Sequence, residues 1–322
     1  MSTTIQSELL DPTTLAESLR TQGYVADQAL VSTLYLSGKL GKPLLIEGEA
    51  GVGKTEIAKC LAVAHHRQLI RLQCYEGQDA QHALYDWDYQ RQLLSIQMQG
   101  DASATDLTDT LYSEDFLLKR PLLQAIASAE PVVLLIDEVD RADQEFEALL
   151  LEILSDFQVS IPELGTYKAK SQPLVVLTSN GVRELSYALR RRCLYHYIDY
   201  PTGDKEQAII KSRLPGINDK LTRQVVSFVQ KLRTLGLRKT PGVAESIDWA
   251  EALMSVGADN LYTNPELSES TLSCLVKTRN DIELLKMQEI SFKQAPVEDE
   301  PQSGSSSERL NDAHSTASNV KH

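Results

Sequence analysis

Three closely spaced glycines, followed by a lysine and a threonine, have the spacing of a loop that binds phosphate groups. This stretch follows the short apolar segment Leu44–Ile46 and precedes a predicted helix over Thr55–Val63, so it lies between a strand and a helix, as such a loop must. Its glycines let backbone N–H groups turn toward phosphates, Lys54 contacts the β- and γ-phosphates, and the Thr55 hydroxyl ligates Mg²⁺. The alternative is a chance glycine-rich turn, which the full motif in this context disfavours. The predicted nucleotide-binding residues are Gly48, Glu49, Ala50, Gly51, Val52, Gly53, Lys54 and Thr55.

A second apolar segment, Val132–Ile136, ends in the two carboxylates Asp137 and Glu138. In an open α/β sheet, ligands lie beyond the carboxyl ends of the strands. Asp137 is therefore predicted to hold Mg²⁺ through water near Thr55, and Glu138 to polarise the water that attacks the γ-phosphate. An acidic turn after a strand is the alternative, and it is a common one when no phosphate loop precedes it.

The apolar segment Leu174–Leu177 is followed by Thr178, Ser179, Asn180 and Gly181. An asparagine at the carboxyl end of a strand next to that of Asp137 would hydrogen-bond the attacking water or the γ-phosphate. Taken alone, Asn-Gly is only a turn signal. Asn180 is a predicted catalytic residue because of its expected position beside Asp137.

Three successive arginines, Arg190, Arg191 and Arg192, follow this segment. One of them could be an arginine finger, a cation offered to the γ-phosphate bound by a neighbouring subunit, because the planar guanidinium matches phosphate oxygens and stays charged. They could also form a phosphate or nucleic-acid patch, or simply a solvated face. Arg141 is a further candidate for a contact between subunits.

Short apolar strands alternate with helical segments up to about residue 200, which predicts a parallel sheet covered on both faces. The sequence therefore predicts an α/β fold with the parallel-sheet core of a P-loop NTPase, followed by a smaller all-helical lid. The predicted strands are Leu44–Ile46, Leu69–Leu72, Val132–Ile136, Leu174–Leu177 and Tyr195–Ile198. The predicted lid helices are Asp204–Arg213, Leu221–Leu235, Val243–Ser255 and Leu267–Met287.

Four parts of the chain follow from these patterns. We expect a flexible N-terminus over residues 1–20, an ATPase-type core over 21–200, a helical lid over 201–292 and a disordered, serine-rich tail over 293–322. Within the core, residues 77–110 are polar and aromatic without clear periodicity, which indicates an inserted element or a long loop.

The composition excludes several classes of protein. The formal net charge of −13 argues against bulk binding to nucleic acid or anionic lipid. No apolar run approaches the roughly 20 residues of a membrane span, and the N-terminus lacks a secretory signal, so we expect a cytoplasmic protein. The widely spaced cysteines indicate neither a disulfide framework nor a zinc site. The histidines lack metal-binding spacing, and no Ser/His/Asp arrangement is present.

Together these residues resemble the AAA+ ATPase superfamily. The stretch Asp137–Ala142 is similar to the MoxR branch. Three further segments look most like CoxD-type proteins, namely Arg71–Gly77, Leu84–Tyr89 and Arg238–Glu245. The resemblance covers roughly residues 20 to 290. It implies ATP and Mg²⁺ as cofactors and a homo-oligomeric ring, usually a hexamer, with nucleotide between subunits. It also implies chaperone-like remodelling of a protein client, commonly with a von Willebrand factor A-domain partner. CoxD-type members are associated with maturing a molybdenum- and copper-containing carbon monoxide dehydrogenase.

The resemblance also carries roles to particular residues. It makes Glu138 the residue that activates water, Asn180 the sensor of the γ-phosphate and Arg192 the arginine finger, although Arg190 and Arg191 stay open for that last role. The chain departs from the family at sensor 2, where many relatives have an arginine just after a proline. Here Gly242 follows Pro241, so either Arg238 or Lys239 substitutes or the lid contributes little to catalysis.

The function predicted from the sequence is therefore Mg²⁺-dependent ATP hydrolysis coupled to remodelling or maturation of a protein client, with a metalloenzyme as one candidate. One alternative is a nucleic-acid-stimulated or clamp-loader-like AAA+ ATPase, which the net charge of −13 disfavours. The other is a nucleotide-gated binding module with weak hydrolysis, which the presence of Glu138 and Asn180 disfavours.

Overall fold

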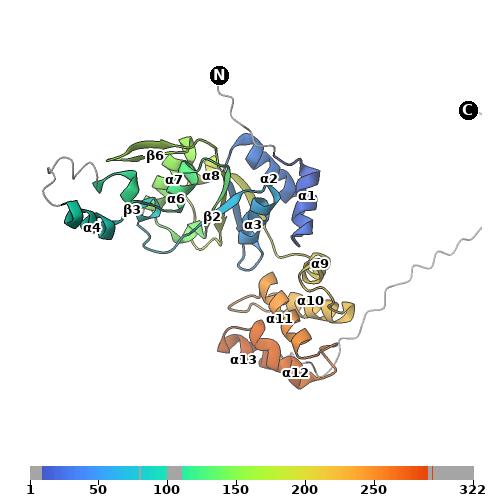
Figure 1. The fold of residues 1–322 in the computed structure, drawn as a ribbon. Coiled ribbons are helices and arrows are strands. Elements are labelled where there is room, and N and C mark those ends of the chain that lie inside the picture. The colour runs from blue at the N-terminus through green and yellow to red at the C-terminus, as the bar shows by residue number, and fades with distance from the viewer. Residues whose placement is uncertain (1–8, 80, 100–110, 289–291, 293–322) are drawn as a thin grey trace, which may run out of the picture.

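The computed structural model describes residues 9–79, 81–99, 111–288 and 292, and a five-stranded parallel sheet forms its centre (Figure 1). The strand order is β2-β5-β8-β1-β9, and every neighbouring pair is parallel. The five predicted strands are all present in this sheet. They are β1 (Leu44–Gly48), β2 (Gln68–Gln73), β5 (Val132–Asp137), β8 (Leu174–Ser179) and β9 (Leu194–Ile198).

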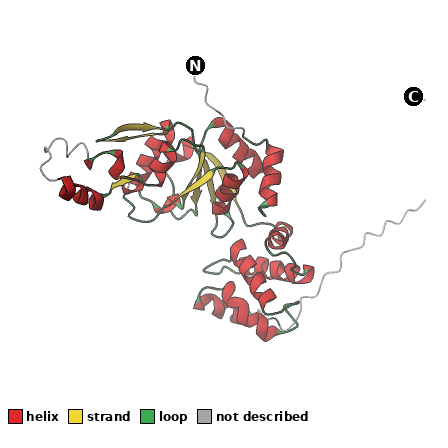
Figure 2. Ribbon diagram, viewed as in Figure 1, coloured by secondary structure: helices red, strands yellow, loops and turns green. Residues whose placement is uncertain are grey.

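Strand β5 shows why the sheet needs helices on both faces. All six of its residues are buried, and successive side chains of a strand point to opposite faces. Val133 and Leu135 pack into one apolar cluster, whereas Leu134 and Ile136 pack into another. Helices α1 to α3 cover the first face and α6 to α8 lie over the second (Figure 2).

The first face is covered by α1 (Pro12–Thr21), α2 (Gln28–Leu40) and α3 (Lys54–Ala64). Helix α1 lies within the segment that was expected to be flexible, so the structure differs there from the expectation. The Asp11 carboxylate accepts the N–H groups of Thr13 and Thr14 at its first turn, and Leu15 and Leu19 are buried. Residues 1–8 of that segment lie outside the described residues, as does the predicted tail over 293–322.

The second face is covered by α6 (Pro121–Ala127), α7 (Gln144–Asp156) and α8 (Tyr187–Arg192). A hairpin of β6 (Gln158–Ile161) and β7 (Gly165–Lys168) follows α7. Part of the stretch 77–110 is more regular than predicted. A second hairpin of β3 (Tyr85–Trp87) and β4 (Leu117–Lys119) carries helix α4 (Tyr89–Gln99). Residues 80 and 100–110 lie outside the described part.

After Pro201 the described chain forms helices that pack around their own apolar cluster. They are α9 (Gly203–Arg213), α10 (Asp219–Arg233), α11 (Val243–Ser255), α12 (Pro265–Ser270), the 3₁₀ turn η4 (Thr271–Cys274) and α13 (Arg279–Met287). Among the described residues, no helix has the length and apolar character that a membrane crossing requires.

The prediction of one helix over Leu267–Met287 is wrong, because this segment breaks into α12, η4 and α13. The Thr271 hydroxyl donates to the Ser268 carbonyl and accepts the indole N–H of Trp249 at 2.8 Å. Thr278 then begins a new helix by capping the N–H of Asp281. Hydrogen bonds from distant parts of the lid therefore override the local helical periodicity.

A buried ion pair joins the first three lid helices. Glu206 of α9 is fully buried, and the Arg233 guanidinium of α10 donates to its two oxygens at 2.7 and 2.8 Å. The Ser246 hydroxyl of α11 donates to the same carboxylate at 2.7 Å. Arg233 also lies over the ring of Tyr200, with 4.6 Å between its guanidinium carbon and the ring centroid. These contacts fix the lid to the linker that joins it to the core.

We expect Arg233→Ala to lower the free energy of unfolding of the lid by about 3–5 kcal/mol, because it leaves the Glu206 charge buried without a partner. Urea unfolding followed by Trp249 fluorescence, in a chain with Trp87 replaced by phenylalanine, measures this change. Arg279→Ala is the matched control, since Arg279 pairs with Glu283 at 2.9 Å but is 90% exposed. The control should stay within about 0.5 kcal/mol of the parent. Equal losses in the two variants would contradict the assignment.

Candidate nucleotide and metal site

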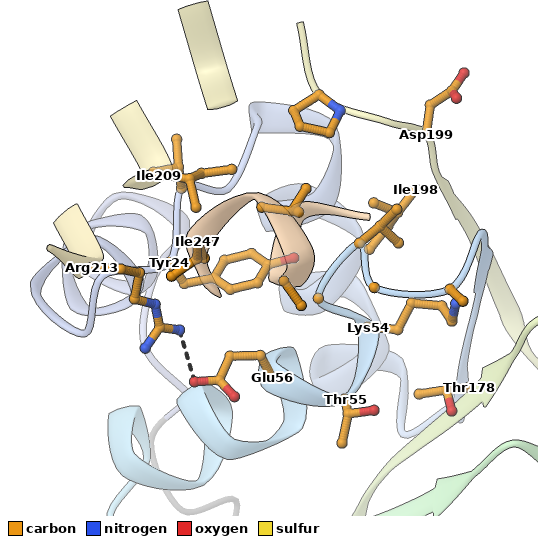
Figure 3. A pocket seen from close by; sticks show the side chains of 18 of the residues that line it. Tyr24, Lys54, Thr55, Glu56, Thr178, Ile198, Asp199, Ile209, Arg213 and Ile247 are labelled. Atoms are coloured by element: carbon orange, nitrogen blue, oxygen red, sulfur yellow. Dashed lines mark hydrogen bonds and ion pairs between the residues drawn. The ribbon is translucent and has the colours of Figure 1, made fainter. Parts of the chain in front are cut away.

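A cavity of about 520 Å³ opens at the carboxyl ends of β1, β5 and β8, between the core and the lid (Figure 3). Its size is that of a site for a small molecule or cofactor. The core contributes residues 50–56, Asp137, Glu138, Thr178 and Asn180, and the lid contributes Val243, Ala244, Ile247 and Asp248. The structure thus brings most of the predicted site residues to one place.

The predicted phosphate loop connects β1 to α3, which begins at Lys54 as the sequence indicated. Gly51 and Gly53 have φ angles of +75° and +92°, a left-handed conformation that favours glycine. Lys54 is only 7% exposed, and its ammonium donates to the Gly48 and Glu49 carbonyls at 2.7 and 2.6 Å. Burial lowers the pKa of Lys54, and nearby carboxylates, Asp140 first, oppose that shift. The lysine is therefore inside the loop, at the entrance of α3, where phosphates would lie.

Oxygen atoms suited to a magnesium ion converge beside this lysine. The Thr55 hydroxyl donates to Asp137 Oδ1 at 3.0 Å, and the Thr178 hydroxyl donates to the same atom at 2.5 Å. Asp137 is 2% exposed. A hydroxyl and a single carboxylate next to a phosphate site fit Mg²⁺, which retains waters and takes phosphate oxygens as further ligands. Within the described ranges, no group of three or more His, Cys, Asp or Glu residues could hold a metal ion without such a phosphate.

A cation that the sequence reasoning missed contacts this carboxylate. The Arg71 guanidinium, from the neighbouring strand β2, donates to Asp137 Oδ2 at 2.6 Å. The pairing of Gln73 with Asp137 across the two strands brings Arg71 close. The only signal in the sequence was an arginine in an otherwise apolar predicted strand.

Glu138 lines the cavity in an unusual backbone conformation. Its φ and ψ are 54° and 49°, in the left-handed region that few non-glycine residues adopt, and its N–H donates to the Thr178 hydroxyl at 2.9 Å. Such strain, of about 1–3 kcal/mol, gathers at functional sites. The carboxylate pairs with Arg141 at 2.5 Å. Arg141, a candidate for a contact between subunits, thus has a partner in its own chain.

Asn180 also lines the cavity, at the end of β8 and beside β5, as predicted. Its position depends on a residue to which the sequence reasoning gave no role. The buried carboxylate of Asp140 accepts the N–H groups of Asn180 and Val182 at 3.1 and 2.8 Å. Asp140 thereby fixes the loop that carries Asn180 at the cavity that Asp137 and Glu138 also line.

The three successive arginines have different surroundings, and none is among the residues that line the cavity of its own chain. Arg190 is tied to both Glu47 oxygens at 3.1 Å and lies over the Tyr195 ring. Arg192 is exposed, and its Nε donates to the Ser155 hydroxyl at 2.8 Å. Arg191 is exposed as well. Arg190 thus serves its own chain, whereas the other two face outward.

Neither candidate for sensor 2, Arg238 or Lys239, is among the residues that line the cavity. The backbone N–H groups of Arg238 and Lys239 both point to Asp281, inside the lid. The lid instead meets the phosphate loop through its backbone, because the N–H groups of Val243 and Ala244 donate to the Gly51 carbonyl at 3.0 and 3.2 Å. A Cβ atom on Gly242 would lie 2.8 Å from the Gly51 Cα, which explains the glycine after the proline.

Two lid cations that the sequence analysis did not single out line the cavity. Lys205 pairs with Asp27 at 3.2 Å and Arg213 with Glu56 at 2.8 Å, and both pairs join α9 to the core. Near Arg213 the lining becomes apolar. Figure 3 shows Tyr24 and Ile247 on this side and Lys54 and Thr178 on the other.

Burial raises the pKa of Tyr24, in keeping with this apolar setting. The cavity therefore has a polar compartment that suits phosphates and an apolar one that suits a flat ring. The apolar compartment could not be predicted, because its residues come from segments far apart in the chain.

Comparison with known proteins shows which proteins this chain resembles. Residues 43–193 match the AAA domain of the dynein-related subfamily. An uncharacterized protein of Staphylococcus haemolyticus is 24% identical over 224 residues, covering 67% of this chain and 78% of that protein. Fidgetin-like protein 1 of Xenopus laevis is 27% identical over 194 residues, covering 58% of this chain and 25% of that protein.

Among solved structures, the RuvB Holliday junction branch migration motor of Thermotoga maritima is 20% identical. It covers 76% of this chain and 67% of its own, with a TM-score of 0.43. The domain match spans the phosphate loop, β5 and β8, which are the segments that build the polar compartment. Residues 43–193 of this chain therefore form an AAA domain, with the parallel-sheet fold of a P-loop NTPase.

Proposed function

We propose that this chain hydrolyses ATP at the described cavity with Mg²⁺ and uses the cycle to remodel a protein client. The core over residues 21–200 would supply the catalytic groups and the lid over 201–292 would close the site. One observation carries the proposal. The Thr55 hydroxyl and the Asp137 carboxylate, 82 residues apart in the chain, meet at 3.0 Å. The ammonium of Lys54 is buried in the adjoining loop.

Each residue then has a defined task. Backbone N–H groups of the loop bind phosphate oxygens, and Lys54 exchanges its bonds to the loop carbonyls for bonds to phosphate. Thr55 and Asp137 would hold Mg²⁺, which would neutralise charge on the phosphates. Glu138 accepts a proton from the attacking water, and Asn180 orients that water or the γ-phosphate.

The ring is part of the proposal, because the cavity lacks an arginine at the γ-phosphate end among its described lining residues. AAA+ proteins commonly assemble as rings, and a neighbouring subunit could supply Arg191 or Arg192, which face outward. The MoxR-like stretch Asp137–Ala142 supports a client-remodelling role, with a von Willebrand A-domain protein as partner and a metalloenzyme under maturation as client. The net charge of −13 disfavours a nucleic-acid motor.

We expect Glu138→Gln to bind ATP with nearly unchanged affinity and to lose turnover by about 10²–10⁴-fold, because the amide cannot accept the proton. Phosphate release and the binding of a fluorescent ATP analogue measure the two properties separately. Glu145→Gln, the same chemical change on an exposed position at the start of α7, is the control and should keep wild-type turnover. Turnover near wild type in Glu138→Gln would refute the role of Glu138.

Mixed assemblies identify the arginine that acts between subunits. We expect alanine at the responsible position, Arg191 or Arg192, to lower turnover by about 10³-fold in a uniform assembly. Mixing it with Glu138→Gln subunits should restore activity, since each mutant supplies what the other lacks.

Arg190→Ala serves as the contrast, because it breaks the pair with Glu47 inside one chain. We expect it to lower the melting temperature and to show no such complementation. An absence of complementation for both Arg191→Ala and Arg192→Ala would argue against a contact between subunits.

A further inference from the structure

Two arginines of the same chain cap the acidic pair of the site. Arg71 pairs with Asp137 and Arg141 with Glu138, at 2.6 and 2.5 Å. We propose that Arg71 is a positioning residue that competes with the divalent cation for Asp137 and so sets the metal affinity of the site. This inference rests on the proposed function, because it assumes that Asp137 is a metal ligand.

The hydrogen bonds divide the Asp137 carboxylate between two kinds of partner. Oδ1 accepts the hydroxyl groups of Thr178 and Thr55, at 2.5 and 3.0 Å. Oδ2 accepts the Arg71 guanidinium at 2.6 Å, and Thr55 lies farther from it at 3.3 Å. Arg71 thus makes the shorter of the two bonds to Oδ2, and Gln73 supports it by accepting from the same nitrogen at 2.5 Å.

The local charge explains why a cation is needed there. Asp137, Glu138 and Asp140 place three carboxylates within four residues, and two of them, Asp137 and Asp140, are 2% exposed. A carboxylate buried without a partner is costly. Arg71 therefore stabilises the metal-free site. It must leave Oδ2 for a cation to bind there, because two positive charges cannot share that atom closely.

Exposure shows that Arg71 can leave. Its side chain is 48% exposed and extends from an outer strand of the sheet, so it can turn to solvent without opening the core. The Arg233 side chain of the lid pair is only 6% exposed and has no such freedom. Arg71 is thus a displaceable counter-ion, whereas Arg233 is a fixed one.

The test uses Mn²⁺ as a spectroscopic probe of the metal site. We expect Arg71→Ala, with a non-hydrolysable ATP analogue present, to bind Mn²⁺ about five- to tenfold more tightly than wild type in an electron paramagnetic resonance titration. The same variant should melt at a lower temperature in EDTA, since Asp137 loses its partner. Arg71→Lys keeps the charge, and its Mn²⁺ affinity and melting temperature should lie between those of wild type and Arg71→Ala. It provides a second variant if Arg71→Ala folds poorly.

Arg120→Ala is the matched control. Arg120 is 49% exposed and pairs with Asp86 at 2.6 Å, as Arg71 does with Asp137, but Asp86, unlike Asp137, is not among the residues that line the cavity. Its loss should leave Mn²⁺ affinity unchanged. Unchanged or weaker Mn²⁺ binding in Arg71→Ala, with wild type binding normally, would overturn the inference alone. Failure of the wild-type chain to bind Mn²⁺ with the nucleotide analogue would instead overturn the proposed function.

Discussion

The burial of one carboxylate, Asp137, is the constraint on which the site depends. Strand β5 is apolar along its length and ends in this charge, which lies almost entirely out of solvent. Its partners Thr55, Thr178 and Arg71 come from α3, β8 and β2. They converge only because β5 lies between β2 and β8 in a parallel sheet. The strand order is therefore what brings the partners of the Asp137 carboxylate together.

The lid depends on a second buried charge. Glu206 holds the first three lid helices together through Arg233 and Ser246. Helix α11 is then placed with its first N–H groups on the Gly51 carbonyl. A shift of the phosphate loop would thus move the start of α11 directly, because backbone groups make this contact and Gly242 leaves room for it. The lid needs no arginine after Pro241 to contact the loop.

Local patterns allowed the prediction of the five strands, the phosphate loop, and the positions of Asp137 and Asn180, because each is encoded in a short segment. The roles of Arg71, Asp140 and Arg213 could not be predicted, since each depends on a partner in another strand or domain. The break between α12 and α13 could not be predicted for the same reason, because the indole of Trp249, on another helix, stabilises it. Hydrophobic periodicity predicts which face of an element is apolar, but it does not predict hydrogen bonds to residues far away in the chain.

Residue type alone is a poor guide to the role of an arginine in this fold. Arg190 and Arg191 are adjacent on α8, yet one is tied to Glu47 and the other faces outward, because successive helical residues point about 100° apart. The arginines differ in the exposure of their side chains, which decides whether the guanidinium can turn to solvent when another cation binds its carboxylate partner. Arg71 and Arg141 both have about half of their side chain exposed, whereas Arg233 does not. The counter-ions of the site are thus the exchangeable ones, and the counter-ion of the lid is permanent.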